Sequence, residues 1–369
     1  FFGVSIKGNT LDIILPVGIS FYTFQTLSYT IDVYRRKLEP ARDFLTYAAY
    51  VCFFPQLVAG PIERGTHLLP QFRKLHQFDY ARAVDGLRQI LWGLVKKIVI
   101  ADNCAHFADK VFNNPDNHNG ASLALGVLAF TFQIYGDFSG YSDIAIGTSR
   151  LFGFDLKQNF AFPYFSRDIA EFWRRWHISL STWFRDYLYI PLGGSRGSRA
   201  EQIRNVFIIF LVSGFWHGAN WTFVVWGLLH AIYFLPLLLL GRNRNHLEVV
   251  AAHRWYPSFR EVWQMLTTFL LVSVAWIFFR VETVGEAFVM LRGIGSPSLF
   301  GGSSLIPERL GVAVLLFVVV EWFGRRDAHA LERLFLSWPR VLRWLIYLLL
   351  ATLVLVYQGP KQGFIYFQF

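Results

Sequence analysis

The chain has 369 residues, of which 54% are hydrophobic and only 16% are charged, whereas a soluble domain carries about 25% charged residues. This composition excludes an ordinary soluble enzyme. The net charge of +10 would suit a nucleic-acid partner, but the basic residues lie in short loops between apolar blocks, where orientation in a membrane explains them, so we expect no nucleic acid to bind.

Eight apolar blocks predict an all-α polytopic membrane protein. A bilayer core is crossed by about 20 residues of helix, and most of the blocks are close to that length. In chain order they cover residues 13–31, 44–62, 84–101, 121–146, 205–240, 262–279, 310–322 and 344–357. The third block is the weakest because Arg88, Lys96 and Lys97 interrupt it. No internal repeat divides the chain, so we predict a single membrane domain over residues 1–369.

Loop charge predicts the orientation of these spans. Basic residues dominate four loops, which the positive-inside tendency assigns to the cytoplasm: 63–82, 150–204, 241–260 and 324–343. Residues 102–120 and 280–309 are acidic or near neutral and are predicted to face outward. The chain opens with Phe1 and enters its first apolar block almost at once, so we expect N-terminal helices of the parent protein to be missing.

The uncharged run 205–240 is predicted to form a broken hairpin. Its 36 residues would make a helix of about 54 Å, too long for one crossing of about 30 Å and too short for two with a turn. Both flanks are basic, so both ends are predicted to be cytoplasmic and one arm to be short, tilted or re-entrant. The break is expected at 214–220, where Gly214, Gly218 and Asn220 interrupt the apolar pattern.

His217 lies at this break, beside Trp216 and Asn220. An ionisable group at membrane depth is a functional candidate because its burial is costly. A neutral imidazole can accept a proton from a substrate hydroxyl as a general base. The alternative is a neutral histidine that only bonds two helices together, which is the interpretation we favour for His230 in the smooth apolar helix that follows.

Residues 168–187 are predicted to form an amphipathic helix in the cytoplasmic interface, because aromatic and aliphatic residues recur at helical spacing. His177 shares the aromatic face and is expected to point towards membrane or protein. Arg174 and Arg175 lie beside it. A plain membrane-surface anchor is the equally weighted alternative.

Asp137 and Asp143, near the end of the span 121–146, are costly unless they are paired or hydrated. We expect them to orient a histidine, to pair with Arg174 or Arg175, or to form a purely structural ion pair. The prolines of residues 55–61 are expected to break the second span and shape an irregular cavity wall, and residues 191–197 to form a plain turn. We expect no metal site, because no HxxxH, HExxH or Cys–His cluster occurs, and no serine-hydrolase elbow is present.

Several of these segments together resemble the membrane-bound O-acyltransferase family, in its branch that acetylates exopolysaccharides such as alginate. The segments are 54–61 (FPQLVAGP), 137–143 (DFSGYSD), 172–180 (FWRRWHISL), 189–195 (YIPLGGS), 213–221 (SGFWHGANW) and 363–369 (GFIYFQF). The resemblance runs from about residue 11 to the end. It implies a bundle of roughly 8–10 transmembrane helices, with interfacial and re-entrant helices around a central tunnel.

The resemblance implies that His217 is the central catalytic residue and His177 a second functional histidine. Asp137, Asp143, Trp216, Asn220, Arg174 and Arg175 would support the site or line its tunnel. Acetyl-CoA would be the cytoplasmic acyl donor, with no cofactor bound permanently. The protein would lie in the lipid of the bacterial inner membrane and pass acetyl groups to a periplasmic acetyltransferase partner, for a polysaccharide acceptor.

Acyl transfer also requires donors for the tetrahedral oxyanion, for which Asn220 and Trp221 are the candidates. Two other hypotheses are compatible with the sequence. One keeps the acyltransferase activity but assigns a different acyl group or acceptor: D-alanyl transfer to teichoic acid, or acetyl transfer to peptidoglycan or cellulose. The other is a transporter with broken helices, which would predict repeat symmetry between halves, and the sequence shows none.

Overall fold

The computed structural model describes residues 18–303, 307–359 and 362–365, and every regular element in these ranges is helical. Three of the described helices are long and apolar enough to cross a membrane: α6 (Gly120–Leu151), α10 (Trp221–Leu239) and α11 (Phe259–Arg280). The structure thus confirms an all-α protein with membrane-spanning helices. The predicted number of spans remains a prediction.

A long helical rod packs along α6. It consists of α4 (Tyr80–Leu94), the π-helical turn η1 (Val95–Ala101) and α5 (Asp102–Phe112), which follow one another directly. Glycines permit the close approach: a Cβ on Gly93 would lie 2.6 Å from the Gly140 carbonyl oxygen, and one on Gly86 would lie 2.7 Å from that of Gly147. Small residues at such crossings let two backbones touch. The predicted span 84–101 is therefore part of a longer helix.

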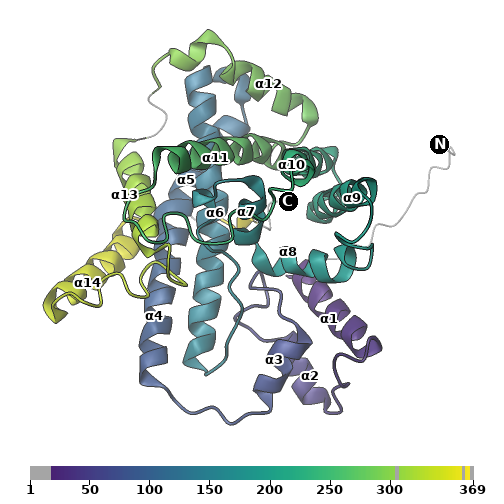
Figure 1. Cartoon of the computed structure of the whole chain (residues 1–369). Helices are drawn as coiled ribbons and strands as arrows, with labels where there is room; N and C mark the ends of the chain where they lie inside the picture. The colour runs from purple at the N-terminus through teal and green to yellow at the C-terminus, as the bar shows by residue number, and fades with distance from the viewer. Residues whose placement is uncertain (1–17, 304–306, 360–361, 366–369) are drawn as a thin grey trace, which may run out of the picture.

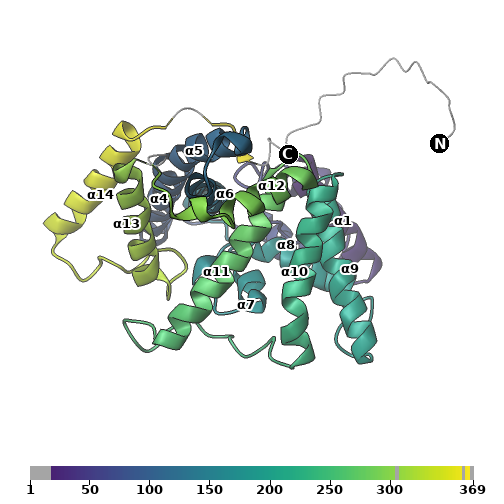
Figure 2. The same cartoon turned by 90° about the horizontal axis from the view of Figure 1, so that it is seen from above.

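The rod and α6 cross a second group of helices steeply. In Figure 1, α4 and α6 run down the picture while α9 (Arg199–His217) and α10 are seen nearly end-on; Figure 2 shows the reverse. The 32 residues of α6 make about 48 Å of helix, more than the roughly 30 Å of a bilayer core, so a crossing by α6 requires a strong tilt.

The α9–α10 hairpin confirms the predicted break but corrects the length of its first arm. α9 ends at His217 and α10 starts at Trp221, each with 19 residues, or about 28 Å. The arm is longer than predicted because a capping box of Ser198 and Glu201 starts the helix at Arg199, ahead of the uncharged run. Asn220 at the tip donates to the Glu282 carbonyl at 2.8 Å, so the tip lies beside the end of α11 and the first arm is not short.

The N-terminal third departs from prediction at the second block. α1 (Ile19–Tyr34) covers most of the first predicted span, of which residues 13–17 lie outside the described residues. The predicted span 44–62 is wrong: α2 (Phe44–Val51) has only eight residues, and the chain then runs through turns to α3 (Gly65–Phe72). Pro55 and Pro61 account for this end, since proline removes a helical hydrogen bond and restricts the residue before it.

The C-terminal predictions are confirmed as helices. α13 (Glu308–Gly324) and α14 (Arg340–Val356) cover the last two apolar blocks. They pack at the edge of the molecule, beside α4 (Figure 1). The remaining elements are α12 (Val284–Ile294) and the single 3₁₀ turns η2 (Pro115–Asn117), η3 (Pro163–Phe165) and η5 (Pro297–Phe300).

The predicted helix 168–187 is wrong in its continuity, and its apolar face packs on protein; its place at the membrane interface stays a prediction. It is two short helices, α7 (Ile169–Arg175) and α8 (Ile178–Phe184), followed by the π-helical turn η4 (Arg185–Tyr189). Its apolar face is buried in the protein core, with Phe172, Trp176 and Leu180 almost fully enclosed. The aromatic pattern is that of a membrane-surface helix, but here α1, α6 and α10 cover the face that lipid would have covered.

Candidate active site

Two histidines and a tryptophan form the centre of the candidate site. His217 is the last residue of α9, and His177 joins α7 to α8. The Trp216 ring centroid lies 4.7 Å from that of His217 and 6.4 Å from that of His177. The structure therefore brings together three residues that the sequence singled out in two separate segments.

His177 is held inward by an unusual backbone conformation. Its φ of 44° lies in the left-handed region, which non-glycine residues enter only when their surroundings require it. This breaks the helix between α7 and α8 and turns the imidazole into the core, where it is 1% exposed. The Phe138 ring packs edge-on against it at 4.6 Å. The prediction that His177 points into the protein is confirmed.

Asn159 determines which nitrogen of His177 carries the proton. Its Oδ1 lies 3.1 Å from His177 Nδ1 and also accepts from the Ser179 hydroxyl at 3.0 Å. Ser179 Oγ in turn accepts from the Ile62 N–H at 2.9 Å. An amide oxygen only accepts, so His177 Nδ1 is the donor and Nε2 holds a lone pair.

The hydrogen bond to Asn159 leaves His177 neutral, with Nε2 as the nitrogen that can accept a proton. Within the described residues, His177 Nε2 is buried and makes no hydrogen bond. Burial, together with the nearby His217 imidazole, lowers the pKa of His177 well below its usual value. Asn159 is not among the residues predicted from the sequence, because it lies 18 residues before His177 in a stretch with no recognisable motif.

His217 lies in an aromatic enclosure at the hairpin tip. Its ring is 5.1 Å from Trp226 on the second arm and 5.0 Å from Phe279 at the end of α11. Three helix ends therefore meet around one imidazole. His217 itself is only partly buried.

His230 has a different role from His217. Its Nδ1 accepts a hydrogen bond from the Trp173 indole at 3.2 Å, and its side chain is fully buried. This bond links α10 to α7. The contact agrees with the structural interpretation of His230.

Asp137 and Asp143 pair with lysines of η1. Asp137 lies 2.7 Å from Lys97 Nζ and accepts from the Ile365 N–H at 2.7 Å. Asp143 lies 3.0 Å from Lys96 Nζ. The predicted pairing with Arg174 or Arg175 is therefore wrong, and the structural ion pair is what forms. The reason is the glycine-mediated approach of η1 to α6, which brings both lysines beside the carboxylates.

Arg174 and Arg175 bind the loop between α10 and α11. Arg174 donates to the carbonyls of Asn243 and His246 at 2.8 and 2.9 Å. Arg175 pairs with Glu171 at 2.9 Å and donates to the Glu248 carbonyl. Both guanidinium groups thus anchor backbone and do not contact the histidine pair through these bonds.

Asn220 is occupied as a helix cap. Its Oδ1 accepts from the Thr222 N–H at 3.1 Å while its amide nitrogen donates to Glu282. Trp221 is exposed on the outside of the tip. Neither side chain is directed to the histidines by these contacts, so the structure does not favour them as the oxyanion donors.

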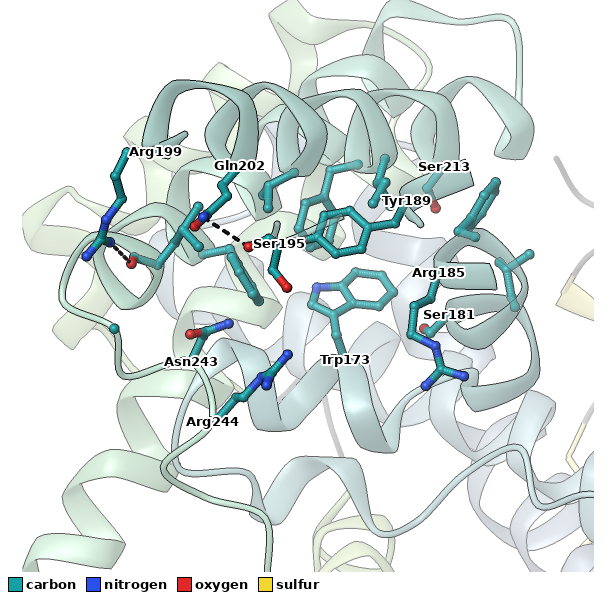
Figure 3. Close-up of a pocket in the computed structure, with 18 residues that line it drawn as sticks. Trp173, Ser181, Arg185, Tyr189, Ser195, Arg199, Gln202, Ser213, Asn243 and Arg244 are labelled. Carbon is teal, nitrogen blue, oxygen red and sulfur yellow. Dashed lines mark hydrogen bonds between the residues drawn. The ribbon is translucent and has the colours of Figure 1, made fainter. Parts of the chain in front are cut away.

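A slot of about 530 Å³ runs along one face of α9 (Figure 3). Arg199 and Gln202 lie towards one end, with Asn243 and Arg244 across from them, and Ser213 lies at the other end. Between them the walls are apolar and aromatic, with Trp173 at the centre. Arg199 and Ser213 are separated by about 21 Å of helix.

The end of the slot at Ser213 lies one helical turn before His217. Arg199, Gln202, Val206, Phe210 and Ser213 share one face of α9, and on a helix that face continues from Ser213 to His217, one turn further on. Arg199 and Arg244 lie towards one end of the slot, and Arg185 lies towards the end that carries Ser213.

The fold and site define an all-helical membrane protein in which a buried histidine, His177, and a partly buried one, His217, lie among aromatic rings. The chain belongs to the membrane-bound O-acyltransferase family, whose model matches residues 35–259.

Characterised relatives support this assignment. The probable alginate O-acetylase AlgI of Pseudomonas aeruginosa is 42% identical to this chain. The match covers 86% of this chain and 59% of that protein. The protein of the same name from Pseudomonas putida is 39% identical, over 97% of this chain and 76% of that protein. The peptidoglycan O-acetyltransferase of Helicobacter pylori is 40% identical, over 78% of this chain and 58% of its own. The chain spans about three fifths of the length of the first two alginate relatives it matches, at 59% and 62%.

Proposed function

We propose that this protein is an O-acyltransferase that moves an acetyl group from a cytoplasmic thioester towards a cell-envelope polysaccharide. The observation that carries the proposal is the slot along α9, which runs from Arg199 and Arg244 to Ser213, one helical turn before His217. The names of the relatives agree with this chemistry, since they include alginate O-acetylases and a peptidoglycan O-acetyltransferase.

The slot suits acetyl-CoA as the donor. Arginine side chains at its entrance match the phosphates of the nucleotide end. The long apolar passage would take the thin pantetheine arm, which would present the thioester beyond Ser213. The predicted orientation places this entrance, formed by residues of the basic segments 150–204 and 241–260, at the cytoplasmic side.

In this proposal the acceptor hydroxyl attacks the thioester carbonyl while His217 takes its proton. The carbon–sulfur bond then breaks as the carbon–oxygen bond forms, and the proton passes from His217 to the departing thiolate. His177 supplies a second neutral imidazole whose Nε2 faces the centre as an acceptor. The aromatic walls keep water from competing with the hydroxyl.

The acceptor is expected to be reached from the opposite side of the membrane. The hairpin tip that carries His217 lies beside the end of α11, in the region predicted to face outward. We propose that a periplasmic acetyltransferase partner takes the acetyl group there and modifies an exopolysaccharide such as alginate, in the inner membrane of a bacterium. Peptidoglycan acetylation and D-alanyl transfer to teichoic acid, the activities in the names of other relatives, are the competing outcomes.

Filling the slot tests the donor route. Ser213→Trp is expected to weaken CoA binding and to lower acetyl transfer at least about tenfold, because the indole would block the inner end of the passage. Binding of CoA to the purified protein and the acetyl content of the polymer are the two measurements. Val212→Trp is the matched control, since Val212 is the neighbouring residue of α9 and is 39% exposed. Equal CoA binding by both variants would rule out this slot as the donor site.

Asn159→Leu tests the positioning of His177. Loss of the Oδ1 acceptor frees the imidazole to change tautomer, and we expect transfer to fall about 10- to 100-fold. Asn159→Asp keeps an acceptor and should restore much of the rate. Its negative charge would raise the pKa of His177, so the acid limb of the pH–rate profile should move to higher pH. A purely structural role would leave that limb unmoved.

A further inference from the structure

A second cavity, of about 300 Å³, lies beneath the segment that carries His177. Ile178, Ser179 and Thr182 form part of its wall, and Arg64 lies in it between the turns after α2 and the start of α3. It is separate from the slot along α9, with which it shares Arg185.

Arg64 is buried without hydrogen-bond acceptors. The residue is 7% exposed, and neither Nη atom makes a hydrogen bond within the described residues. Its ion pair with Asp186 is long, at 3.8 Å, and its other close neighbour is the face of the Tyr187 ring at 4.6 Å. A buried guanidinium with unused donors is costly and uncommon in a folded protein.

The contrast with Arg325 shows what a satisfied buried arginine looks like in this protein. Arg325 is 3% exposed, and it donates to the carbonyls of Val250, Trp322, Ala251 and Arg254 at 2.7–3.0 Å. Arg64 has nothing equivalent. Its Nη donors are therefore unused, and the residue lines the cavity.

The charge around the cavity favours an anion. Four more cationic residues line it, namely Arg35, Lys37, Lys157 and Arg185, and all four are exposed. The two carboxylates that line it are already engaged: Asp32 accepts from the Tyr187 hydroxyl at 2.6 Å, and Asp186 accepts from Arg185 at 2.8 Å. Five cations against two carboxylates leave the lining with an excess of three positive charges.

We propose that this cavity binds a phosphate group, with Arg64 at its base and Arg35, Lys37, Lys157 and Arg185 at its rim. A tetrahedral phosphate offers the paired oxygens that a planar guanidinium recognises through two parallel hydrogen bonds. The phosphate can belong to a soluble phosphomonoester or to a lipid headgroup. The site does not depend on the proposed acetyl transfer, because its test measures binding alone.

The test uses the full chain in nanodiscs of phosphatidylcholine, titrated at fixed ionic strength with fructose 1,6-bisphosphate, a bisphosphate that lacks the nucleotide of CoA. Arg64→Gln is expected to weaken binding at least about tenfold, the loss of a charge-assisted pair. Arg36→Gln is the matched control, because Arg36 is an exposed neighbour that does not line the cavity, and it should bind as the parent does. Arg35→Gln with Lys157→Gln removes only exposed charges, so it tests the site even where Arg64→Gln folds poorly; we expect about threefold weaker binding.

In a second experiment, part of the phosphatidylcholine is replaced by phosphatidylglycerol, and the midpoint of thermal unfolding is recorded. A rise in the midpoint that requires Arg64 or the rim pair, without a response to the bisphosphate, assigns the site to a lipid headgroup. A response to the bisphosphate assigns it to a soluble phosphomonoester. If neither probe distinguishes these variants from Arg36→Gln, the cavity holds only water and the proposal is overturned.

Discussion

Replacing His217 by alanine is expected to lower acetyl transfer by a factor of about 10²–10⁴, the contribution of a positioned general base. The imidazole ends α9 and lies against Trp216, Trp226 and Phe279, so the substitution removes the base while most of the aromatic enclosure remains. The measurement is the O-acetyl content of the envelope polymer from cells that carry only the variant. CoA binding by the purified protein should persist, because the slot ends one turn before His217.

His230→Gln is the matched control for this experiment. His230 lies on the second arm of the same hairpin, and glutamine keeps an acceptor for the Trp173 indole. We expect transfer close to that of the parent protein, with at most a modest loss of stability. Unchanged acetylation in His217→Ala, or an equal loss in both variants, would contradict the assignment of His217 as the base.

Replacing Lys96 by methionine is expected to reduce the free energy of unfolding by about 3–5 kcal/mol. Its Nζ lies 3.0 Å from Asp143 and 3.1 Å from Glu321, and all three residues are buried. Glu321 also accepts hydrogen bonds from Trp92 at 3.0 Å and from Tyr135. Without Lys96, two buried carboxylates would lose their common counter-charge. Equilibrium unfolding in mixed micelles, followed by tryptophan fluorescence, measures the change.

Two further variants separate this charge effect from general damage to the helix. Lys97→Met removes the adjacent lysine, whose side chain is 23% exposed against 5% for Lys96. It should cost less because solvent reaches this lysine and because its buried partner Asp137 keeps the Ile365 N–H. The double variant Lys96→Met with Glu321→Gln removes one orphaned charge and should recover part of the lost stability. A loss from Lys96→Met no larger than that from Lys97→Met would refute the buried network as a main source of stability.

The sequence predicted the helices whose signals are local. The apolar blocks 121–146 and 262–279 became α6 and α11, and the break between Gly214 and Asn220 became the hairpin turn. Backbone hydrogen bonds within a helix are made between near neighbours, so composition and helix-breaking residues are sufficient to locate them. The second block does not form one continuous span, and its non-helical end agrees with the break expected from the prolines of residues 55–61.

The candidate site could be predicted in its residues but only partly in its contacts. His217, His177 and Trp216 were identified from the sequence, and they lie together. The partners of Asp137 and Asp143 were not, because Lys96 and Lys97 reach them only where η1 crosses α6. Residues 168–187 were predicted to lie at the membrane surface. An aromatic helix face has the same sequence pattern whether lipid or protein covers it.

The sequence by itself determined that this is a membrane protein, that a hairpin turns next to His217, and that its motifs are those of an O-acyltransferase family. Each rests on hydrophobicity or on a contiguous motif. Only the tertiary structure decided that Asn159 bonds to His177, that a slot runs along α9 as far as Ser213, and that the Nη atoms of Arg64 are buried without hydrogen-bond partners. These features depend on how tilted helices cross, which sets distances between residues far apart in the chain and leaves no local signal in the sequence.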